Sequence, residues 1–250
     1  ANLVRVLQRQ TKLPVGLVAA ADVMQGSARI KAALNAATEE GTRIAIVDAI
    51  SDDQLYDIGT ACAGLELITG GSGIACGLPE NFRRAGLVAN DASAAAHIPD
   101  TPGHEAVIAG SCSSATLAQL AHAERSCPVL RINPVSVMSG ADVAAEALAW
   151  AEAHLGNTRP IFAASADPDQ VATAQQQFGR MEIGEALEHT LAKIAQGLVE
   201  KGVRRLVVAG GETSGAVVQA LDITTLRIGP EIDPGVPWCE TLNDPKLALA

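Results

Sequence analysis

Short apolar runs alternate with amphipathic segments along most of this chain. Short runs bounded by glycine or polar residues are typical of buried strands, and they occupy residues 15–18, 43–47, 65–68, 106–109, 129–132, 161–164, 206–210 and 226–228. Apolar residues at helical spacing predict helices at residues 2–11, 26–40, 52–63, 113–123, 142–154 and 181–200. Two more helices are expected, one that opens at the glycine turn of residues 69–75 and reaches about residue 84, and one after residue 211. This alternation predicts an α/β fold with mainly parallel sheets joined by right-handed crossovers.

The alternation stops between residues 88 and 104, where asparagine, aspartate, serine, proline and glycine accumulate with little periodicity. Such clusters are typical of loops and linkers. We therefore expect two α/β domains, residues 1–90 and 105–250, with a linker at residues 91–104 and three α/β/α layers in the second domain. A chain of 250 residues with 48% hydrophobic content can bury cores of this size.

The composition argues against several classes of partner. The formal net charge is −10 and no run of lysine or arginine exceeds a pair, so we expect neither nucleic acid nor a membrane surface as a partner. Aromatic residues make up only 2% of the chain, which leaves few platforms for base stacking. The five cysteines form no Cys-x-x-Cys pair, and no leader or long uncharged apolar run is present. These features favour a cytoplasmic protein with buried thiols.

Two strand–helix turns combine glycine with hydroxyl side chains. They read Gly210-Gly211-Glu212-Thr213-Ser214 and Gly110-Ser111-Cys112-Ser113. A helix N-terminus presents unpaired N–H groups and glycine lets a ligand approach the backbone, so each turn could hold a phosphate. Capped turns without any ligand have the same composition. Because the carboxyl ends of parallel strands share an edge, these two turns could converge on one ligand. A third glycine turn, at Gly70, also follows a predicted strand.

Common nucleotide and hydrolase motifs are not matched. The turns match none of three patterns: the Walker A motif Gly-x-x-x-x-Gly-Lys-Ser/Thr, the dinucleotide-binding fingerprint Gly-x-Gly-x-x-Gly, and the nucleophile elbow Gly-x-Ser-x-Gly. Ser111, Cys112 and His122 are the best nucleophile and base set, which makes an acyl-transfer hydrolase a distant third interpretation. Asp48, at a strand end, could orient a hydroxyl or serve as a turn or cap residue. Glu212 would repel a phosphate in its turn unless Mg²⁺ lies between them. It could therefore bond a ribose or a metal-bound water, or point away as a first-turn helix charge.

Three long motifs carry a family resemblance. They are Gly210-Gly211-Glu212-Thr213-Ser214-Gly215-Ala216-Val217, Thr69-Gly70-Gly71-Ser72-Gly73-Ile74-Ala75, and a Pro/Gly-rich stretch at residues 227–238, of which 229–238 is expected to be a loop. Together they resemble the four-carbon acid sugar kinases, nearest to the 3-oxo-tetronate kinase branch. The resemblance implies ATP- and Mg²⁺-dependent phosphorylation of the 4-hydroxyl of a four-carbon acid sugar such as 3-oxo-tetronate. It implies ATP binding at Ser111, Gly210, Gly211, Glu212, Thr213 and Ser214, with the catalytic residues unassigned.

Members of this family are longer, because they begin with an Asp-Asp-Phe-Thr-Gly type strand and end with a Ser-Gly-Asn-Phe-Gly type segment. The resemblance therefore identifies residues 1–90 as the later part of a substrate-binding domain and residues 105–250 as most of a nucleotide-binding domain. It implies an acid sugar near the Gly70 turn, across an interdomain cleft. The alternatives are a nucleotide-binding fragment without catalytic activity and a threonate or erythronate kinase. A homodimer is left open.

Overall fold

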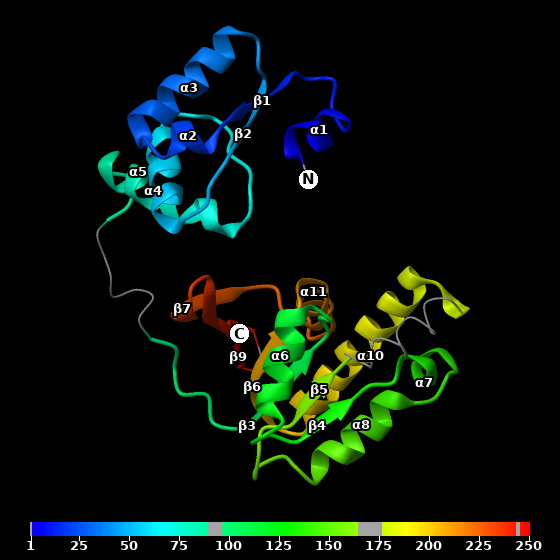
Figure 1. Ribbon diagram of the computed structural model, residues 1–250. Coiled ribbons are helices and arrows are strands. Elements are labelled where there is room, and N and C mark those ends of the chain that lie inside the picture. Colours follow the sequence, from blue (N-terminus) through cyan, green and yellow to red (C-terminus); the bar gives the residue numbers. More distant parts are fainter. Residues whose placement is uncertain (1, 90–96, 165–176, 244–245) are drawn as a thin grey trace. The chain divides into compact units, whose positions relative to one another are not determined.

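The computed structural model describes residues 2–89, 97–164, 177–243 and 246–250. The chain divides into two compact units, Ala1–Ala92 and Ser93–Ala250, each with its own hydrophobic core (Figure 1). The predicted linker at residues 91–104 lies partly outside the described residues, so its bounds stay a prediction. Among the described helices, none is both long and apolar enough to cross a bilayer.

The first unit packs its helices against a two-stranded parallel sheet. Its elements are α1 (Leu3–Gln8), β1 (Val15–Val18), α2 (Ala20–Val23), α3 (Ser27–Glu39), β2 (Ile44–Val47), α4 (Asp52–Ala61), the 3-10 helix η1 (Ser72–Gly77) and α5 (Pro79–Arg84). The strands pair with Val15 opposite Ile44. The core consists of Val18, Val23, Ile30, Ile58, Ala61 and Cys62.

Helix α4 and η1 meet backbone to backbone. A Cβ built on Gly59 would lie 2.3 Å from the carbonyl carbon of Gly77, and one built on Gly77 would lie 2.3 Å from the carbonyl oxygen of Leu55. No side chain can occupy that space unless the two segments move apart. The two glycines therefore set the distance between α4 and η1.

The strand predicted at residues 65–68 is wrong. These residues form no strand, and Leu67 is 84% exposed. An apolar run becomes a strand only when a neighbour pairs with its backbone, and the described strands of this unit, β1 and β2, pair with each other. The helix predicted to open at the glycine turn of residues 69–75 and to reach Arg84 is divided into η1 and α5 ahead of Pro79, because proline lacks an N–H and clashes with the preceding turn.

The second unit is built around a seven-stranded sheet with the order β4-β5-β3-β6-β9-β8-β7. Its strands are β3 (His104–Ala109), β4 (Val129–Arg131), β5 (Ile161–Ala163), β6 (Val203–Ala209), β7 (Leu226–Asp233), β8 (Val236–Thr241) and β9 (Ala248–Leu249). The strands from β4 to β9 in this order are parallel, and β8 runs antiparallel to β9 and β7. The predicted α/β class with mainly parallel sheets is confirmed.

Helices cover both faces of this sheet. They are α6 (Ser114–Ala123), α7 (Pro134–Met138), α8 (Val143–Glu152), α10 (Arg180–Glu200) and α11 (Gly211–Ala220). The apolar stripe of α10, including Leu191 and Leu198, packs with α8 and α11 against Phe162 in the main core. On the other face, Leu120 of α6 packs against Ala109 and the alanine and isoleucine side chains of β5. The three predicted α/β/α layers are present (Figure 1).

The stretch at residues 229–238 is a β-hairpin rather than the predicted loop. It comprises most of β7 and the start of β8, with Gly235 at φ +78° in the turn. The register shifts on both sides of Glu231, where Pro230 interrupts the ladder. Proline is tolerated there because β7 is the edge strand of the sheet. The carboxylate of Glu231 accepts a hydrogen bond from the N–H of Gly235 at 2.7 Å, so it stabilises the turn of the hairpin.

Candidate functional site

Strands β3 and β6 are neighbours, so the two glycine turns that follow them lie side by side. The strands end in register, with Ala109 opposite Ala209. The N–H groups of Gly110 and Ser111 both donate to the carbonyl oxygen of Ala209, at 3.0 and 3.4 Å. The structure therefore brings the two turns, far apart in the sequence, to one edge of the sheet.

Glycine has a different role at each position of these turns. A Cβ built on Gly110 would lie 1.8 Å from Oγ1 of Thr213, so only glycine lets the two turns touch. Gly210 has φ +128°, which disfavours any side chain. A Cβ built on Gly211 meets no atom within 4 Å. Gly110 and Gly210 therefore fix the backbone, and Gly211 leaves space open in front of the helix.

A pocket of about 810 Å³ lies at the two turns. It is lined by both turns, by the first half of α10, and by Pro134 and Ala164. Ligand pockets in proteins span roughly 300–1,000 Å³. The cavity is therefore large enough for a nucleotide-sized ligand.

The N-terminus of α11 lines this pocket. The first bond within the helix runs from the N–H of Ser214 to the carbonyl oxygen of Gly210, at 2.8 Å. The N–H groups of Gly211, Glu212 and Thr213 precede it and have no carbonyl partner within the helix. Together with the helix dipole they favour a negative ligand. The site has the geometry of an anion pocket.

Ser111, Gly210, Gly211, Glu212 and Thr213, all predicted to bind ATP, line the pocket. The sixth predicted residue, Ser214, is not among its lining residues. Its hydroxyl donates to the carbonyl oxygen of Gly210 at 2.8 Å, so it is turned back along its own helix.

The hydroxyl oxygen of Ser111 accepts the N–H of Ser113 at 3.2 Å. The hydrogen of the Ser111 hydroxyl can still be donated to a ligand. Ligand binding by this residue and by the other five stays a prediction.

Glu212 meets a carboxyl group that the sequence did not single out. Burial raises the pKa of Glu188, on α10, and the charge of Glu212 and a hydrogen bond with it raise that pKa further. Among the described residues, the acidic and basic side chains that line the pocket are Glu185, Glu188, Glu212 and Arg180. Sequence reasoning missed Glu188 because no local pattern says that α10 lies beside α11.

The other chemical candidates are not assembled into a site. Burial raises the pKa of the Cys112 thiol, which disfavours the nucleophilic thiolate. His122 is exposed in the last turn of α6, about 12 Å along the helix from its start beside Ser111. The carboxylate of Asp48 accepts the N–H of Ala20 at 3.2 Å, so it satisfies the first turn of α2.

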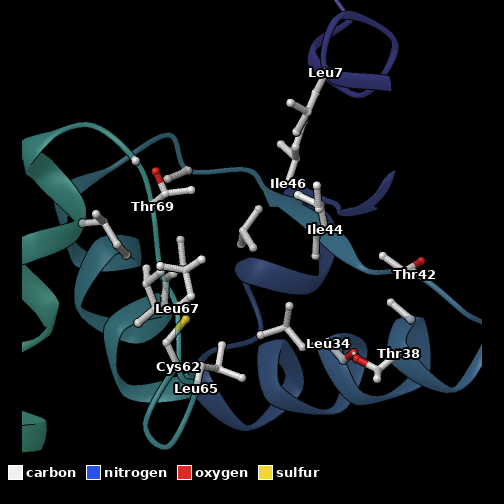
Figure 2. A pocket seen from close by; sticks show the side chains of 18 of the residues that line it. Leu7, Leu34, Thr38, Thr42, Ile44, Ile46, Cys62, Leu65, Leu67 and Thr69 are labelled. Atoms are coloured by element: carbon white, nitrogen blue, oxygen red, sulfur yellow. The ribbon is translucent and has the colours of Figure 1, made fainter. Parts of the chain in front are cut away.

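The Gly70 turn lines a separate pocket of about 750 Å³ within the first unit. Figure 2 shows that aliphatic side chains such as Leu34, Ile44 and Ile46 surround it, with only a few hydroxyl groups. A four-carbon acid sugar carries a carboxylate and hydroxyls, which need polar partners when they are buried. The geometry of this pocket therefore gives no support to acid sugar binding there.

The fold and the site define a class of protein. The second unit is a three-layer α/β/α domain with a pocket at the carboxyl ends of its parallel strands. More specifically, the chain belongs to the family of the nucleotide-binding C-terminal domain, whose family model matches residues 106–250. A sugar-binding N-terminal domain matches residues 1–78.

Curated relatives confirm the resemblance to four-carbon acid sugar kinases. The chain is 51% identical to a 3-oxo-tetronate kinase of Burkholderia multivorans, covering 100% of this chain and 58% of the relative. It is 50% identical to the 3-oxo-tetronate kinase of Cupriavidus necator, covering 100% and 57%. The chain thus spans less than two thirds of the length of these relatives.

Two solved structures are also similar. Protein HI1011 of Haemophilus influenzae has a TM-score of 0.61 at 35% identity, covering 100% of this chain and 60% of the other. A protein of Salmonella typhimurium LT2 has a TM-score of 0.73 at 34% identity, covering 100% and 59%. The fold of the chain is therefore shared by experimentally determined structures.

Proposed function

We propose that this chain binds ATP at the two glycine turns and acts in a kinase that phosphorylates the 4-hydroxyl of 3-oxo-tetronate. The observation that carries this proposal is that the Gly110 and Gly210 turns line one pocket beside the N-terminus of α11. The nucleotide-binding family and the named relatives support the same chemistry.

The phosphates of ATP lie against the start of α11 in this proposal. The N–H groups of Gly211, Glu212 and Thr213 donate to phosphate oxygens, and the Ser111 hydroxyl adds a donor from the neighbouring turn. Each hydrogen bond to a charged group contributes about 1.5–3 kcal/mol. The donors are preorganised because the two turns are fixed by Gly110 and Gly210.

The reaction forms a bond between the substrate hydroxyl oxygen and the γ-phosphorus, and it breaks the bond from that phosphorus to ADP. The proton of the hydroxyl leaves to a base that stays unassigned. Catalysis by positioning and charge stabilisation is sufficient for phosphoryl transfer. Mg²⁺, when bound, offsets the phosphate charge, and the acidic lining of the pocket suits a hydrated cation.

The acid sugar part of the proposal is supported by the sugar-binding match at residues 1–78 and by the relatives. A threonate or erythronate kinase would share the nucleotide pocket and differ in the acceptor. Incubating the chain with ATP, Mg²⁺ and each of the three acids, and measuring ADP release, distinguishes them. We expect ADP release with 3-oxo-tetronate; release with threonate or erythronate alone would replace the proposed substrate.

A nucleotide-binding fragment without catalytic activity is the second candidate, because the chain spans about 58% of its relatives. Calorimetry with ATP and Mg²⁺ tests nucleotide binding independently of catalysis. Binding without ADP release by the chain, together with release by a version extended to the relatives' length, identifies the fragment. Absence of nucleotide binding in both versions would overturn the proposed function.

A further inference from the structure

Two carboxyl groups from different helices meet at the wall of the pocket. Glu188 of α10 and Glu212 of α11 both line it, within hydrogen-bonding reach of each other. The packing of the helices holds this pair. About two turns further along each helix, Nε2 of Gln196 donates to the carbonyl oxygen of Ala220 at 2.6 Å, so α10 and α11 run parallel in a fixed register.

The charge of the pocket conflicts with a bare nucleotide. Among the described residues, its acidic and basic lining consists of three glutamates and one base, the exposed Arg180. A triphosphate that accepts hydrogen bonds from the N–H groups of Glu212 and Thr213 would lie beside the Glu188–Glu212 pair. Like charges at that distance repel each other, most strongly where water is excluded. A cation between the carboxylates and the phosphates removes the conflict.

An unpaired hydroxyl of a largely buried residue in the same wall points independently to a ligand. Thr213 as a residue is 3% exposed, and its hydroxyl has no hydrogen-bond partner in the part of the chain that the structure describes, although its oxygen is not fully enclosed. The Thr213 hydroxyl lies over Gly110, and both residues line the pocket. Because its oxygen is not fully enclosed, the hydroxyl is accessible from the pocket, where a phosphate oxygen would accept its hydrogen.

We infer that Glu188 and Glu212 are the protein ligands of the Mg²⁺ that accompanies ATP, an assignment that rests on the proposed function of this pocket. Phosphate oxygens and water complete the coordination shell of the ion. Thr213 donates its hydroxyl hydrogen to a phosphate of the same complex.

Two carboxylate ligands suit Mg²⁺ better than they suit an ion that takes all of its ligands from the protein. Among the described residues, no group of three or more His, Cys, Asp and Glu side chains could hold a metal. Mg²⁺ is usually bound through one or two carboxylates plus substrate phosphates, and it keeps several waters. Glu188 and Glu212 supply that number of carboxylates. The pair therefore binds the ion strongly only when the nucleotide is present.

The test measures metal binding without relying on turnover. Calorimetry with a non-hydrolysable ATP analogue, with and without Mn²⁺, gives the enhancement of affinity by the metal, and electron paramagnetic resonance counts the bound Mn²⁺. The variants are Glu188→Gln and Glu212→Gln. Glu200→Gln is the matched control because Glu200 is exposed at the far end of α10, away from the pocket lining.

In the wild type, Mn²⁺ should strengthen analogue binding about tenfold or more, since even the hydrogen-bond partners of metal ligands contribute about 10–100-fold to metal affinity. The enhancement should be lost in both pocket variants and kept in Glu200→Gln. Metal-free analogue should bind the pocket variants at least as tightly as the wild type, since one repelling charge is gone.

Two outcomes overturn the inference in different ways. Unchanged enhancement in Glu188→Gln and Glu212→Gln would remove the carboxylate pair as the metal ligands and leave the nucleotide pocket in place. No analogue binding by the wild type, with or without Mn²⁺, would remove the proposed function itself. Melting temperatures of all variants, measured in parallel, identify a loss that comes from unfolding.

Discussion

Replacing Gly211 by valine tests the phosphate site without disturbing the fold. Gly211 opens α11 and lines the pocket, and a Cβ built there meets no atom within 4 Å. Gly215 is the matched control, because it lies one turn further along the same helix, also has no atom within 4 Å of a built Cβ, and is not among the pocket-lining residues. The two substitutions add the same side chain to the same helix.

The expected loss follows from the hydrogen bonds that the valine obstructs. Its side chain would occupy the space in front of the N–H groups of Glu212 and Thr213. Losing two hydrogen bonds of about 1.5 kcal/mol each costs about 3 kcal/mol, or about 100-fold in affinity. The helix propensities of glycine and valine differ by about 0.4 kcal/mol, so stability should change little in either variant.

Calorimetry with ATP and Mg²⁺ measures the affinities, and thermal unfolding followed by circular dichroism measures the stabilities. We expect a large loss of affinity in Gly211→Val, wild-type affinity in Gly215→Val, and similar melting temperatures for both. Equal affinities in the wild type and Gly211→Val would refute the phosphate site. A loss in Gly215→Val of the same size would show that the effect comes from the helix and not from the pocket.

Three further predictions concern single contacts. Gly59→Ala places a methyl group 2.3 Å from the backbone of Gly77 and should lower the free energy of unfolding of the first unit by about 1–3 kcal/mol in urea; an unchanged value contradicts that packing. Thr213→Val keeps the side-chain shape and should lower ATP affinity about tenfold at unchanged stability; undiminished affinity removes its hydroxyl as a phosphate donor. Arg227→Ala leaves Glu240, 7% exposed, without the guanidinium 3.0 Å away, so unfolding in urea should require about 1–3 kcal/mol less; a smaller change would mean that water replaces the arginine.

Hydrophobic spacing predicted most helices and strands of the second unit because each of them buries a regular apolar face. The stripe on α10 with Leu191 and Leu198 is one example. Two predictions failed where pairing decides the structure. Residues 65–68 form no strand, and residues 229–238 belong to a hairpin despite their prolines. Whether a segment joins a sheet depends on a partner strand, which local spacing does not contain.

The candidate site was likewise predicted only in part from the sequence. Glycine and hydroxyl residues after apolar runs identified the turns at Gly110 and Gly210, because a few consecutive residues are enough to recognise such a turn. The Gly110 to Thr213 contact and the Glu188–Glu212 pair depend on which strands and helices are neighbours.

The sequence by itself determined the α/β class, the two glycine turns and the family motifs, since these depend on residues close together in the chain. Only the tertiary structure decided that both turns line one pocket and that Glu188 belongs to it. The physical reason is that the order of strands in a sheet, here β3 beside β6, follows from packing over the whole unit.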